Sequence, residues 1–467
     1  MEEVQRTCDR LPKAFVERMR RLLGSDFQEF MDSYDTERVY GLRRNPLKGT
    51  EKKFLETMPF ALHKISWAAE GFFYDPAEQP GKHVYHEAGA YYIQEPSSMA
   101  VVEILDPKPG ELILDLCAAP GGKSTQIAGR MNGQGFLLSN EIVPGRAKIL
   151  GQNVERMGIR NCVVSNETPE HLASLFPSFF DRIVVDAPCS GEGMFRKDEV
   201  AIKEWSPEHV QMCAQRQRDI LEQAAMMLKT GGVLVYSTCT FSPEENEGVI
   251  SAFLQKHQEF EIEKVPHDPA FISGKPEWLD NPCENLEDTM RLMPHLLSGE
   301  GHFIARLKKS GELFKTPEMS SGNEDKKLQR QVEEFLGEEL GIERGWLTKQ
   351  RGVLQHFGEQ IYLVPGYCID LKGVRIVRPG LHIGTEKKNR IEPSHALALA
   401  LQPGETDRAR EISLEEASRY MRGESLSCDA KERGWLLLVC EGYPIGFGKA
   451  SNGQIKNHYP KGLRREL

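Results

Sequence analysis

The chain of 467 residues is predicted to be an α/β protein, with a parallel sheet at its centre, a small N-terminal α+β domain and a small C-terminal β domain. From about residue 96 to about residue 310, short apolar runs alternate with segments of helical periodicity. This alternation is typical of a parallel sheet that is covered by helices on both faces. Near the C-terminus, two apolar runs flank a Gly-Tyr-Pro turn, which indicates a separate β domain.

Residues 1–95 are predicted to form the small α+β domain. Helical periodicity covers residues 11–31, and residues 58–95 are rich in aromatic side chains and short strand-like runs. Between them lies a basic stretch, which suits contact with phosphate groups, although a solvated turn has nearly the same composition. The basic side chains of this stretch are Arg43, Arg44, Lys48, Lys52 and Lys53.

Residues 96–310 are predicted to form the central domain. A long helix is expected over residues 207–228, with Gly231 and Gly232 as its C-terminal cap. The runs 260–265 and 302–309 are expected to complete the sheet. The main strands are predicted at residues 112–116, 135–141, 162–166, 182–187 and 233–238.

The composition changes again after residue 310. Residues 311–327 are polar and predict a linker, residues 328–394 an intermediate module that opens with a helix, and residues 395–467 the β domain. The tail interleaves basic with aromatic side chains, as RNA-binding surfaces do, although basic tails are often merely solvated. These residues are Lys449, Lys456, His458, Tyr459, Lys461, Arg464 and Arg465.

The overall composition predicts a cytoplasmic, monomeric protein without a membrane span or a bound metal. No apolar run reaches the roughly 18 residues that cross a bilayer, and the N-terminus lacks the apolar core of a signal peptide. The ten cysteines include no CxxC pair, which argues against a zinc site and predicts reduced thiols. The net charge of −10 argues against a globally basic nucleic-acid binder, but local basic patches can still make that contact.

A glycine turn follows the first strand of the central domain. Gly121 and Gly122 let a ligand approach the backbone closely. A P-loop would need a glycine in place of Cys117, and the dinucleotide fingerprint spacing is absent. The next strand ends at Glu141, whose carboxylate can accept hydrogen bonds from both hydroxyls of a ribose. This combination indicates a site for S-adenosylmethionine, and the alternative is a purely structural turn.

Two cysteines follow separate strands of the same predicted sheet. Asp186-Ala-Pro-Cys189 ends the fourth strand, and Ser237-Thr-Cys239 ends the fifth, at the edge where such sheets bind ligands. A cysteine is often only a small buried hydrophobe, but two thiols beside a methyl-donor site favour chemistry. Asp186 could accept a hydrogen bond from the exocyclic amine of cytosine. A proline and three acidic residues follow within 243–247.

Methylation of carbon 5 of a pyrimidine explains such thiols, because that carbon is a poor nucleophile. A thiolate that adds to carbon 6 makes carbon 5 enamine-like, so that it can attack a sulfonium methyl group. A base must then remove the carbon-5 proton so that the thiolate can leave.

The segments LDLCAAPGGKS, DAPCSGEG and YSTCTFSPEENE closely resemble the motifs of the RNA 5-methylcytosine methyltransferase family, the Sun/NOL1/NOP2-like enzymes. YGLRRNPLKG, YYIQEPSSM and GYPIGFGKASNGQIKNHYPKGLRR look like the flanking regions of the bacterial subfamily that methylates small-subunit ribosomal RNA. The resemblance covers nearly the whole chain. It implies a Rossmann-like S-adenosylmethionine-dependent core, an RNA-binding N-terminal extension, a PUA-like RNA-binding C-terminal domain, and 16S ribosomal RNA or the small subunit as partner.

The resemblance also implies roles for individual residues. Cys239 matches the nucleophile, and Cys189 matches the cysteine that assists release of the product. Where the family often has an aspartate near the adenine, this chain has Thr168, with Asn166 or Glu167 as possible substitutes. Asp186 matches a cofactor position and could instead face the cytosine. The other cofactor positions are Cys117, Ala118, Ala119, Pro120, Gly121, Gly122, Lys123 and Glu141.

Three other functions fit part of this pattern. The same chemistry could act on transfer RNA. DNA cytosine methyltransferases use the Pro-Cys cysteine as nucleophile and lack the Thr-Cys partner. A non-catalytic RNA-binding assembly factor would not need Cys239, Cys189 and the glycine turn intact.

Overall fold

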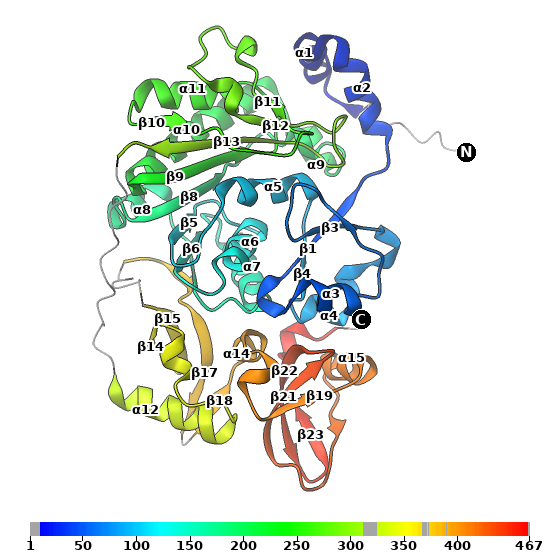
Figure 1. Cartoon of the computed structure of the whole chain (residues 1–467), viewed down its shortest axis with the longest axis vertical. Coiled ribbons are helices and arrows are strands. Elements are labelled where there is room, and N and C mark those ends of the chain that lie inside the picture. The colour runs from blue at the N-terminus through cyan, green and yellow to red at the C-terminus, as the bar shows by residue number, and fades with distance from the viewer. Residues whose placement is uncertain (1–9, 312–324, 367–370, 372, 389, 466–467) are drawn as a thin grey trace.

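The computed structural model describes residues 10–311, 325–366, 371, 373–388 and 390–465. Four sheets follow one another in the order of the chain (Figure 1). Most of the predicted linker, residues 311–327, lies outside the described residues. Within the described part, no helix is long and apolar enough to cross a membrane.

A ten-stranded sheet forms the centre of the molecule. Five neighbouring strands, in the order β9-β8-β5-β6-β7, are parallel. Every residue of β5, β6 and β7 is buried, because helices cover both faces of a parallel sheet. The five strands are β5 (Leu112–Asp115), β6 (Phe136–Asn140), β7 (Cys162–Ser165), β8 (Phe180–Asp186) and β9 (Leu228–Thr238).

Antiparallel strands extend both edges of this sheet. β13 pairs with β9 and is followed outward by β12 and β11, while β10 also pairs with β13. At the opposite edge, β16 comes from the C-terminal half of the chain and pairs with β7. These strands are β10 (Phe260–Ile262), β11 (Ile272–Ser273), β12 (Met290–Leu292), β13 (His302–Lys309) and β16 (Ile376–Arg378).

Helices cover the sheet on both faces, which confirms the predicted α/β fold. On one face Val101, Ile127 and Leu150 of α5, α6 and α7 lie in one apolar core. On the other, Leu172, Leu221 and Val249 of α8, α10 and α11 lie in a second. The helices are α5 (Pro96–Leu105), α6 (Gly122–Met131), α7 (Pro144–Arg156), α8 (Pro169–Leu175), α9 (Glu199–Glu204), α10 (Pro207–Met227) and α11 (Glu247–Lys256).

The predicted glycine cap after the long helix is wrong. Helix α10 ends at Met227, and Leu228 is already extended as the first residue of β9. Gly231, with φ +76°, and Gly232 lie inside β9, where the register against β8 shifts. The glycines therefore accommodate an irregularity of the strand, a common role for glycine in sheets.

The N-terminal region contains two helices and then an antiparallel sheet in the order β2-β3-β1-β4. Phe15 and Phe30 of the two helices pack against Phe195, Trp205 and Phe241 of the central domain. The elements are α1 (Lys13–Leu23), α2 (Phe27–Asp32), β1 (Tyr40–Arg44), α3 (Glu51–Thr57), β2 (His63–Lys64), β3 (Gly71–Tyr74), α4 (Val84–Glu87) and β4 (Tyr91–Ile93).

The interpretation of the basic stretch as a phosphate-binding turn is wrong for three of its five side chains. Arg43 is buried and donates to Thr125 at 2.7 Å. Arg44 is buried and pairs with Glu70, and buried Lys48 donates to a backbone carbonyl. Sequence shows these charges but not their burial, so the exposed cations of the cluster are Lys52 and Lys53.

The C-terminal half contains two further sheets, β14-β15-β17-β18 and β19-β21-β22-β23-β20. Leu397 of α14 and Trp435 of β21 lie in one apolar core, so the two sheets are packed together. The elements are α12 (Lys326–Glu334), α13 (Trp346–Lys349), β14 (Gly352–Phe357), β15 (Gln360–Pro365), β17 (Leu381–Lys387), β18 (Arg390–Pro393), α14 (His395–Ala400), β19 (Ala409–Glu411), α15 (Leu414–Arg422), β20 (Leu426–Ser427), β21 (Gly434–Cys440), β22 (Tyr443–Ser451) and β23 (Gln454–Asn457).

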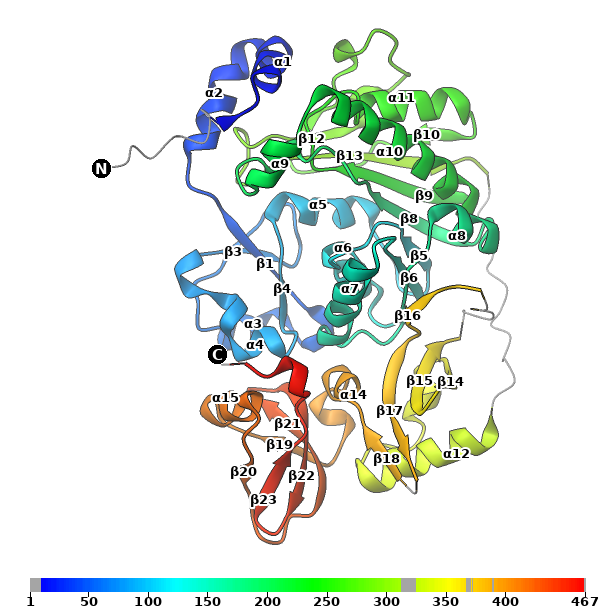
Figure 2. The ribbon, with the colours of Figure 1, turned by 180° about the vertical axis from the view of Figure 1, so that it is seen from behind.

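The last domain packs against the first. Phe54 and Tyr85 share a core with Tyr420 and Tyr443, and Figure 2 shows α15 beside α3 and α4. Tyr459 of the predicted RNA-binding tail is buried in this core. The cations Lys456, Lys461 and Arg464 are exposed.

Candidate active site

The two cysteines meet at the carboxyl edge of the central sheet. β8 and β9 are parallel neighbours, with Asp186 opposite Ser237, so the segments that follow them start side by side. The sulfur atoms of Cys189 and Cys239 are 3.3 Å apart. The hydrogen bond to Cys239, together with burial, raises the pKa of Cys189 well above its ordinary value. At this distance one of the two thiols donates its S–H to the other sulfur.

A buried lysine and a carboxylate lie beside the thiols. Lys123 Nζ is 2.7 Å from Asp186 Oδ2 and 3.1 Å from Ser98 Oγ, and Ser237 Oγ donates to Asp186 Oδ1 at 2.8 Å. Burial opposes ionisation of Asp186, but Lys123, His302 and Ser237 together outweigh it and lower the pKa of this carboxyl. Asp186 is therefore a carboxylate at neutral pH, fixed by two donors on separate elements.

The glycine turn is fixed by its neighbours. Gly121 has φ +118°, a conformation that favours glycine. Arg146 and Asn153 of α7 donate to the carbonyls of Ala119 and Pro120 at 2.8 and 2.9 Å. The amide of Ala118 donates to the next strand of the sheet, and Arg43 donates to the carbonyl of Gly122 at 3.2 Å.

Cys117 also lies in this turn. Burial raises the pKa of its thiol far above the ordinary value. It is therefore a neutral packing group beside the cofactor positions.

The carboxylates around the turn fit an adenosine-containing cofactor. Glu141 is buried, with one oxygen accepting from the amide of Val143 at 2.9 Å and the other 3.3 Å from Arg146. Each carboxylate oxygen can accept a further hydrogen bond. Asp115 is also buried and accepts from Ser124 at 2.7 Å, while its second oxygen has no partner among the described residues. Unused acceptors of this kind suit ribose hydroxyls or an ammonium group.

The three candidates for the adenine contact all take part in local structure. Asn166 donates to the carbonyls of Glu141 and Ile142. Glu167 accepts from the amide of Arg375 at 2.7 Å, and the hydroxyl of Thr168 caps α8. Which of them contacts an adenine stays a prediction.

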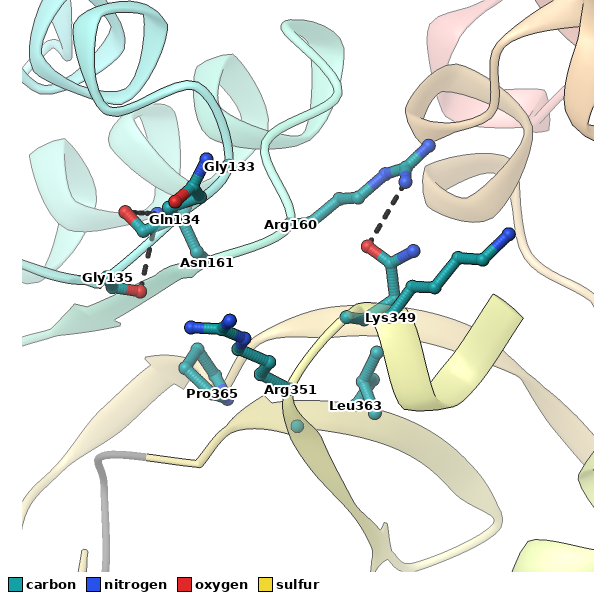
Figure 3. A pocket seen from close by; sticks show the side chains of 11 residues that line it. Gly133, Gln134, Gly135, Arg160, Asn161, Lys349, Arg351, Leu363 and Pro365 are labelled. Carbon is teal, nitrogen blue, oxygen red and sulfur yellow. Dashed lines mark hydrogen bonds between the residues drawn. The ribbon is translucent and has the colours of Figure 1, made fainter. Parts of the chain in front are cut away.

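A separate cavity lies at the opposite edge of the sheet. It has a volume of about 270 Å³ and lies between the turn Gly133–Gly135 and strands β14 and β15 (Figure 3). Arg160 and Asn161, which precede β7, also line it. Because these residues stand at the amino ends of the parallel strands, this cavity is remote from the thiols and belongs to the contact between domains.

Sequence analysis missed two buried carboxylates. Glu192 and Glu245 each accept hydrogen bonds from the backbone of the segment that carries the other cysteine. The available signal was the glutamate three residues after Cys189 and the acidic run after Cys239.

Together, the Rossmann-like sheet, the glycine turn, the carboxylate on the following strand and the thiol pair define an S-adenosylmethionine-dependent methyltransferase. Four family models match in chain order. They are the 16S rRNA methyltransferase RsmB/F over residues 102–308, the N-terminal domain of RsmF over 11–96, the first C-terminal domain of RsmF over 335–401 and the RsmF PUA domain over 408–465. The chain belongs to the RsmF family of ribosomal RNA methyltransferases, which confirms the predicted family and domain types.

Relatives match along their full length. Ribosomal RNA small subunit methyltransferase F of Vibrio vulnificus is 31% identical over 481 residues, with 98% of each chain covered. The protein of the same name from Escherichia coli O157:H7 is 32% identical over 472 residues, with 97% of each covered.

Solved structures match about two thirds of the chain. A methyltransferase homolog protein from Pyrococcus horikoshii is 29% identical, with a TM-score of 0.57, 65% of this chain covered and 98% of that one. NSun6 from Pyrococcus horikoshii, solved with SFG, has the same fold at 22% identity and a TM-score of 0.55, with 64% and 99% covered.

Proposed function

We propose that this methyltransferase modifies carbon 5 of a cytosine in 16S ribosomal RNA, through a covalent bond between Cys239 and carbon 6 of the base. The observation that carries this proposal is the thiol pair, 3.3 Å apart at the ends of β8 and β9. The names of the full-length relatives support the choice of small-subunit RNA.

Two groups near Cys239 would assist its reaction. Cys189 shares a hydrogen bond with this sulfur, and the ammonium of Lys123 interacts with it electrostatically. Donor groups and cations of this kind activate nucleophilic cysteines. Addition of the thiolate to carbon 6 forms the C–S bond and moves electron density to carbon 5.

S-adenosylmethionine, when bound, would supply the methyl group, which its positively charged sulfonium sulfur activates for transfer. The glycine turn and Glu141 are the groups of this chain that would hold it. Asp186 would accept from the exocyclic amine of the cytosine, because a carboxylate fixed by Lys123 and Ser237 keeps an acceptor position free. These contacts would place carbon 5 for reaction.

Release of the product reverses the addition. A base takes the proton from carbon 5, the C5–C6 double bond forms again, and Cys239 leaves as a thiolate. The S–H of Cys189 would stabilise that departing thiolate, because the two sulfur atoms lie 3.3 Å apart. Cys189 therefore assists release and is not required for attack.

Transfer of labelled methyl groups tests the substrate. Small-subunit ribosomal RNA, assembled small subunits and transfer RNA would be offered separately, followed by bisulfite sequencing. We expect 5-methylcytosine in 16S ribosomal RNA, and none with Cys239→Ala. Label mainly in transfer RNA, or at another position of the base, would contradict the proposal.

A further inference from the structure

The two cysteines stand on segments that leave the sheet. We call residues 187–193 the Cys189 loop and residues 239–246 the Cys239 loop. Beyond Asp186 and Ser237, the paired strands no longer fix the distance between these loops. Hydrogen bonds between the loops fix it instead, and two buried glutamates, one on each loop, accept several of them.

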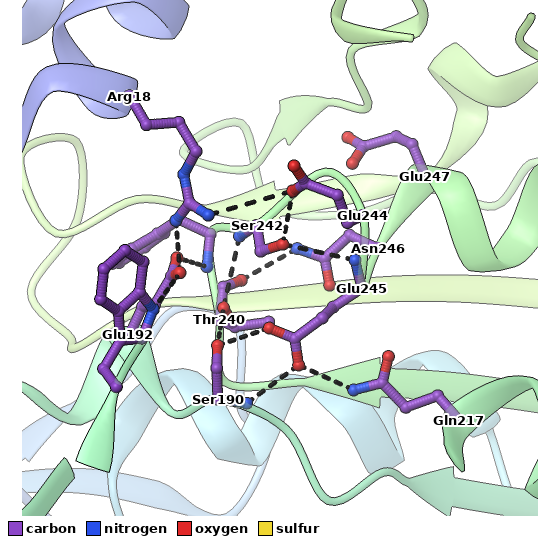
Figure 4. Close-up of polar contacts among 12 residues, drawn as sticks. Arg18, Ser190, Glu192, Gln217, Thr240, Ser242, Glu244, Glu245, Asn246 and Glu247 are labelled. Carbon is purple, nitrogen blue, oxygen red and sulfur yellow. Dashed lines mark hydrogen bonds and ion pairs between the residues drawn. The ribbon is translucent and has the colours of Figure 1, made fainter. Parts of the chain in front are cut away.

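Glu245 of the Cys239 loop holds the Cys189 loop (Figure 4). One carboxylate oxygen accepts from the amide of Ser190 at 2.9 Å and from Gln217 at 2.9 Å, and the other contacts the hydroxyl of Ser190. That hydroxyl also lies 3.0 Å from the hydroxyl of Thr240. The residue after Cys189 is therefore tied to the Cys239 loop through backbone and side chain.

Glu192 of the Cys189 loop makes the reciprocal contact. It accepts from the amide of Phe241 at 3.1 Å and from the indole of Trp205 at 2.8 Å. Next to it, the amide of Gly193 donates to the carbonyl of Cys239 at 2.8 Å. A Cβ at Gly193 would lie only 2.9 Å from that carbonyl oxygen, so the close approach of the two loops requires glycine.

The positive charge beside Glu192 comes from the N-terminal helices. Arg18 of α1 pairs with Glu192, whose side chain has no exposed surface. Phe15 and Phe30 pack against Phe195 and Phe241, with ring centroids 5.1 and 5.2 Å apart. A buried carboxylate without this partner would be strongly destabilised, so the charge on Glu192 depends on α1.

We propose that Glu192 and Glu245 are positioning residues, which form a reciprocal clasp that holds the two thiols at bonding distance, and that Arg18 locks this clasp to α1. Each carboxylate reaches from its own loop to the amide that follows the other loop's cysteine by one or two residues. Removal of either carboxylate would let the sulfur atoms separate. The distance between the two sulfur atoms is a property of the protein alone, whereas the effect of the clasp on turnover rests on the function proposed above.

Phenylarsine oxide measures the spacing without RNA or cofactor. Its arsenic forms two As–S bonds with a close pair of thiols, the two thiol protons leave with the oxide oxygen as one water, and no oxidation occurs. The second bond forms within the molecule, so affinity depends on how near the second thiol is held. Cys239→Ala and Cys189→Ala give the background from the other cysteines.

Glu245→Ala and Glu192→Ala should each weaken arsenical binding at least about tenfold, because the effective concentration of the second thiol falls. The same variants should lower kcat by about 100-fold, as expected for small displacements of reacting groups, with KM for S-adenosylmethionine nearly unchanged. Glu245→Gln should restore most of both, because an amide oxygen still accepts from Ser190 and Gln217. Arg18→Met should produce the Glu192→Ala phenotype in weaker form.

Glu204→Ala is the control, since this carboxylate is exposed at the end of α9 and lies outside both loops. It should bind the arsenical and turn over as the unmodified protein does. Binding of S-adenosylhomocysteine and the melting temperature show whether each variant is folded. Ser190→Ala removes only the hydroxyl contacts of Ser190 with Thr240 and Glu245, so it should weaken arsenical binding less.

Unchanged arsenical affinity in folded Glu245→Ala, Glu192→Ala and Ser190→Ala would overturn the clasp. If arsenical binding weakened but turnover stayed unchanged, the clasp would hold the two thiols close together but would have no role in catalysis. If Cys239→Ala also turned over normally, the thiol mechanism would fail instead.

Discussion

Glu141 is the side chain proposed to hold the ribose of the cofactor. Its place at the end of β6 follows from the strand pattern, and its burial beside the glycine turn leaves acceptors available. Glu141→Ala should weaken binding of S-adenosylhomocysteine by about 1–3 kcal/mol, the cost of hydrogen bonds to a charged group. Calorimetry tests this, with exposed Glu170→Ala as control. Equal dissociation constants for both variants would exclude Glu141 from the site.

Glu245 should make stability depend on pH. Burial raises the pKa of this carboxyl from 4.5 to about 7, so the folded state binds its proton more tightly than the unfolded state. That contribution is fully present below pH 4.5 and is lost as the pH rises to about 7.

Glu245→Gln cannot titrate. The melting temperature of the unmodified protein minus that of the variant should therefore fall across this interval and level off above it. A difference that stays constant with pH would show that Glu245 has an ordinary pKa, and one that rises with pH would show that folding lowers its pKa.

Among single residues, the burial of charged side chains was the least predictable feature. Arg43 and Lys48 look like surface cations in the sequence, yet they bind the glycine-turn helix and α14 from inside the protein. Burial of a charge depends on partners far away in the chain, which periodicity does not reveal. The proximity of Cys189 and Cys239 could be expected from the sequence, because each lies just after an apolar strand of the predicted sheet.

At the scale of elements, the long buried strands were predictable and the short ones were not. β5 to β9 are apolar runs bounded by turn residues, so periodicity identifies them. β16 has three residues. It is a strand because it pairs with β7 at the edge of the parallel part of the sheet. Gly231 and Gly232 are the residue type that caps a helix, but they lie inside β9, the strand that follows the helix.

The exposed cations of the last domain should contribute to RNA binding. Replacement of Lys456, Lys461 and Arg464 by serine should weaken binding and lower the slope of log affinity against log salt by about 0.7–0.9 for each phosphate that these cations neutralise. Lys326→Ser, Lys327→Ser and Arg330→Ser on exposed α12 remove the same charge elsewhere and serve as control. Equal slopes for the two triple variants would remove the assigned role of the tail. Point variants are preferable to deletion from residue 395, which would remove α14 from its core.

For the whole molecule, the N-terminal and C-terminal domains are parts of one assembly around the central sheet. Tyr443 and Tyr459 share a core with Phe54 and Tyr85, and α1 reaches the cysteine loops through Arg18. Sequence predicts the separate domain types but not these contacts, because each depends on side chains that are hundreds of positions apart. The N-terminal region therefore contacts the cysteine loops directly, and the last domain packs against the N-terminal region.

The most direct test of the account is the fate of the covalent bond to RNA. With S-adenosylmethionine and substrate RNA present, Cys189→Ala should form an enzyme–RNA adduct that survives denaturing electrophoresis, because attack proceeds and release stalls. Cys239→Ala should form no adduct and no product. An adduct with Cys239→Ala and none with Cys189→Ala would reverse the two roles, and normal turnover by both variants would contradict the thiol mechanism itself.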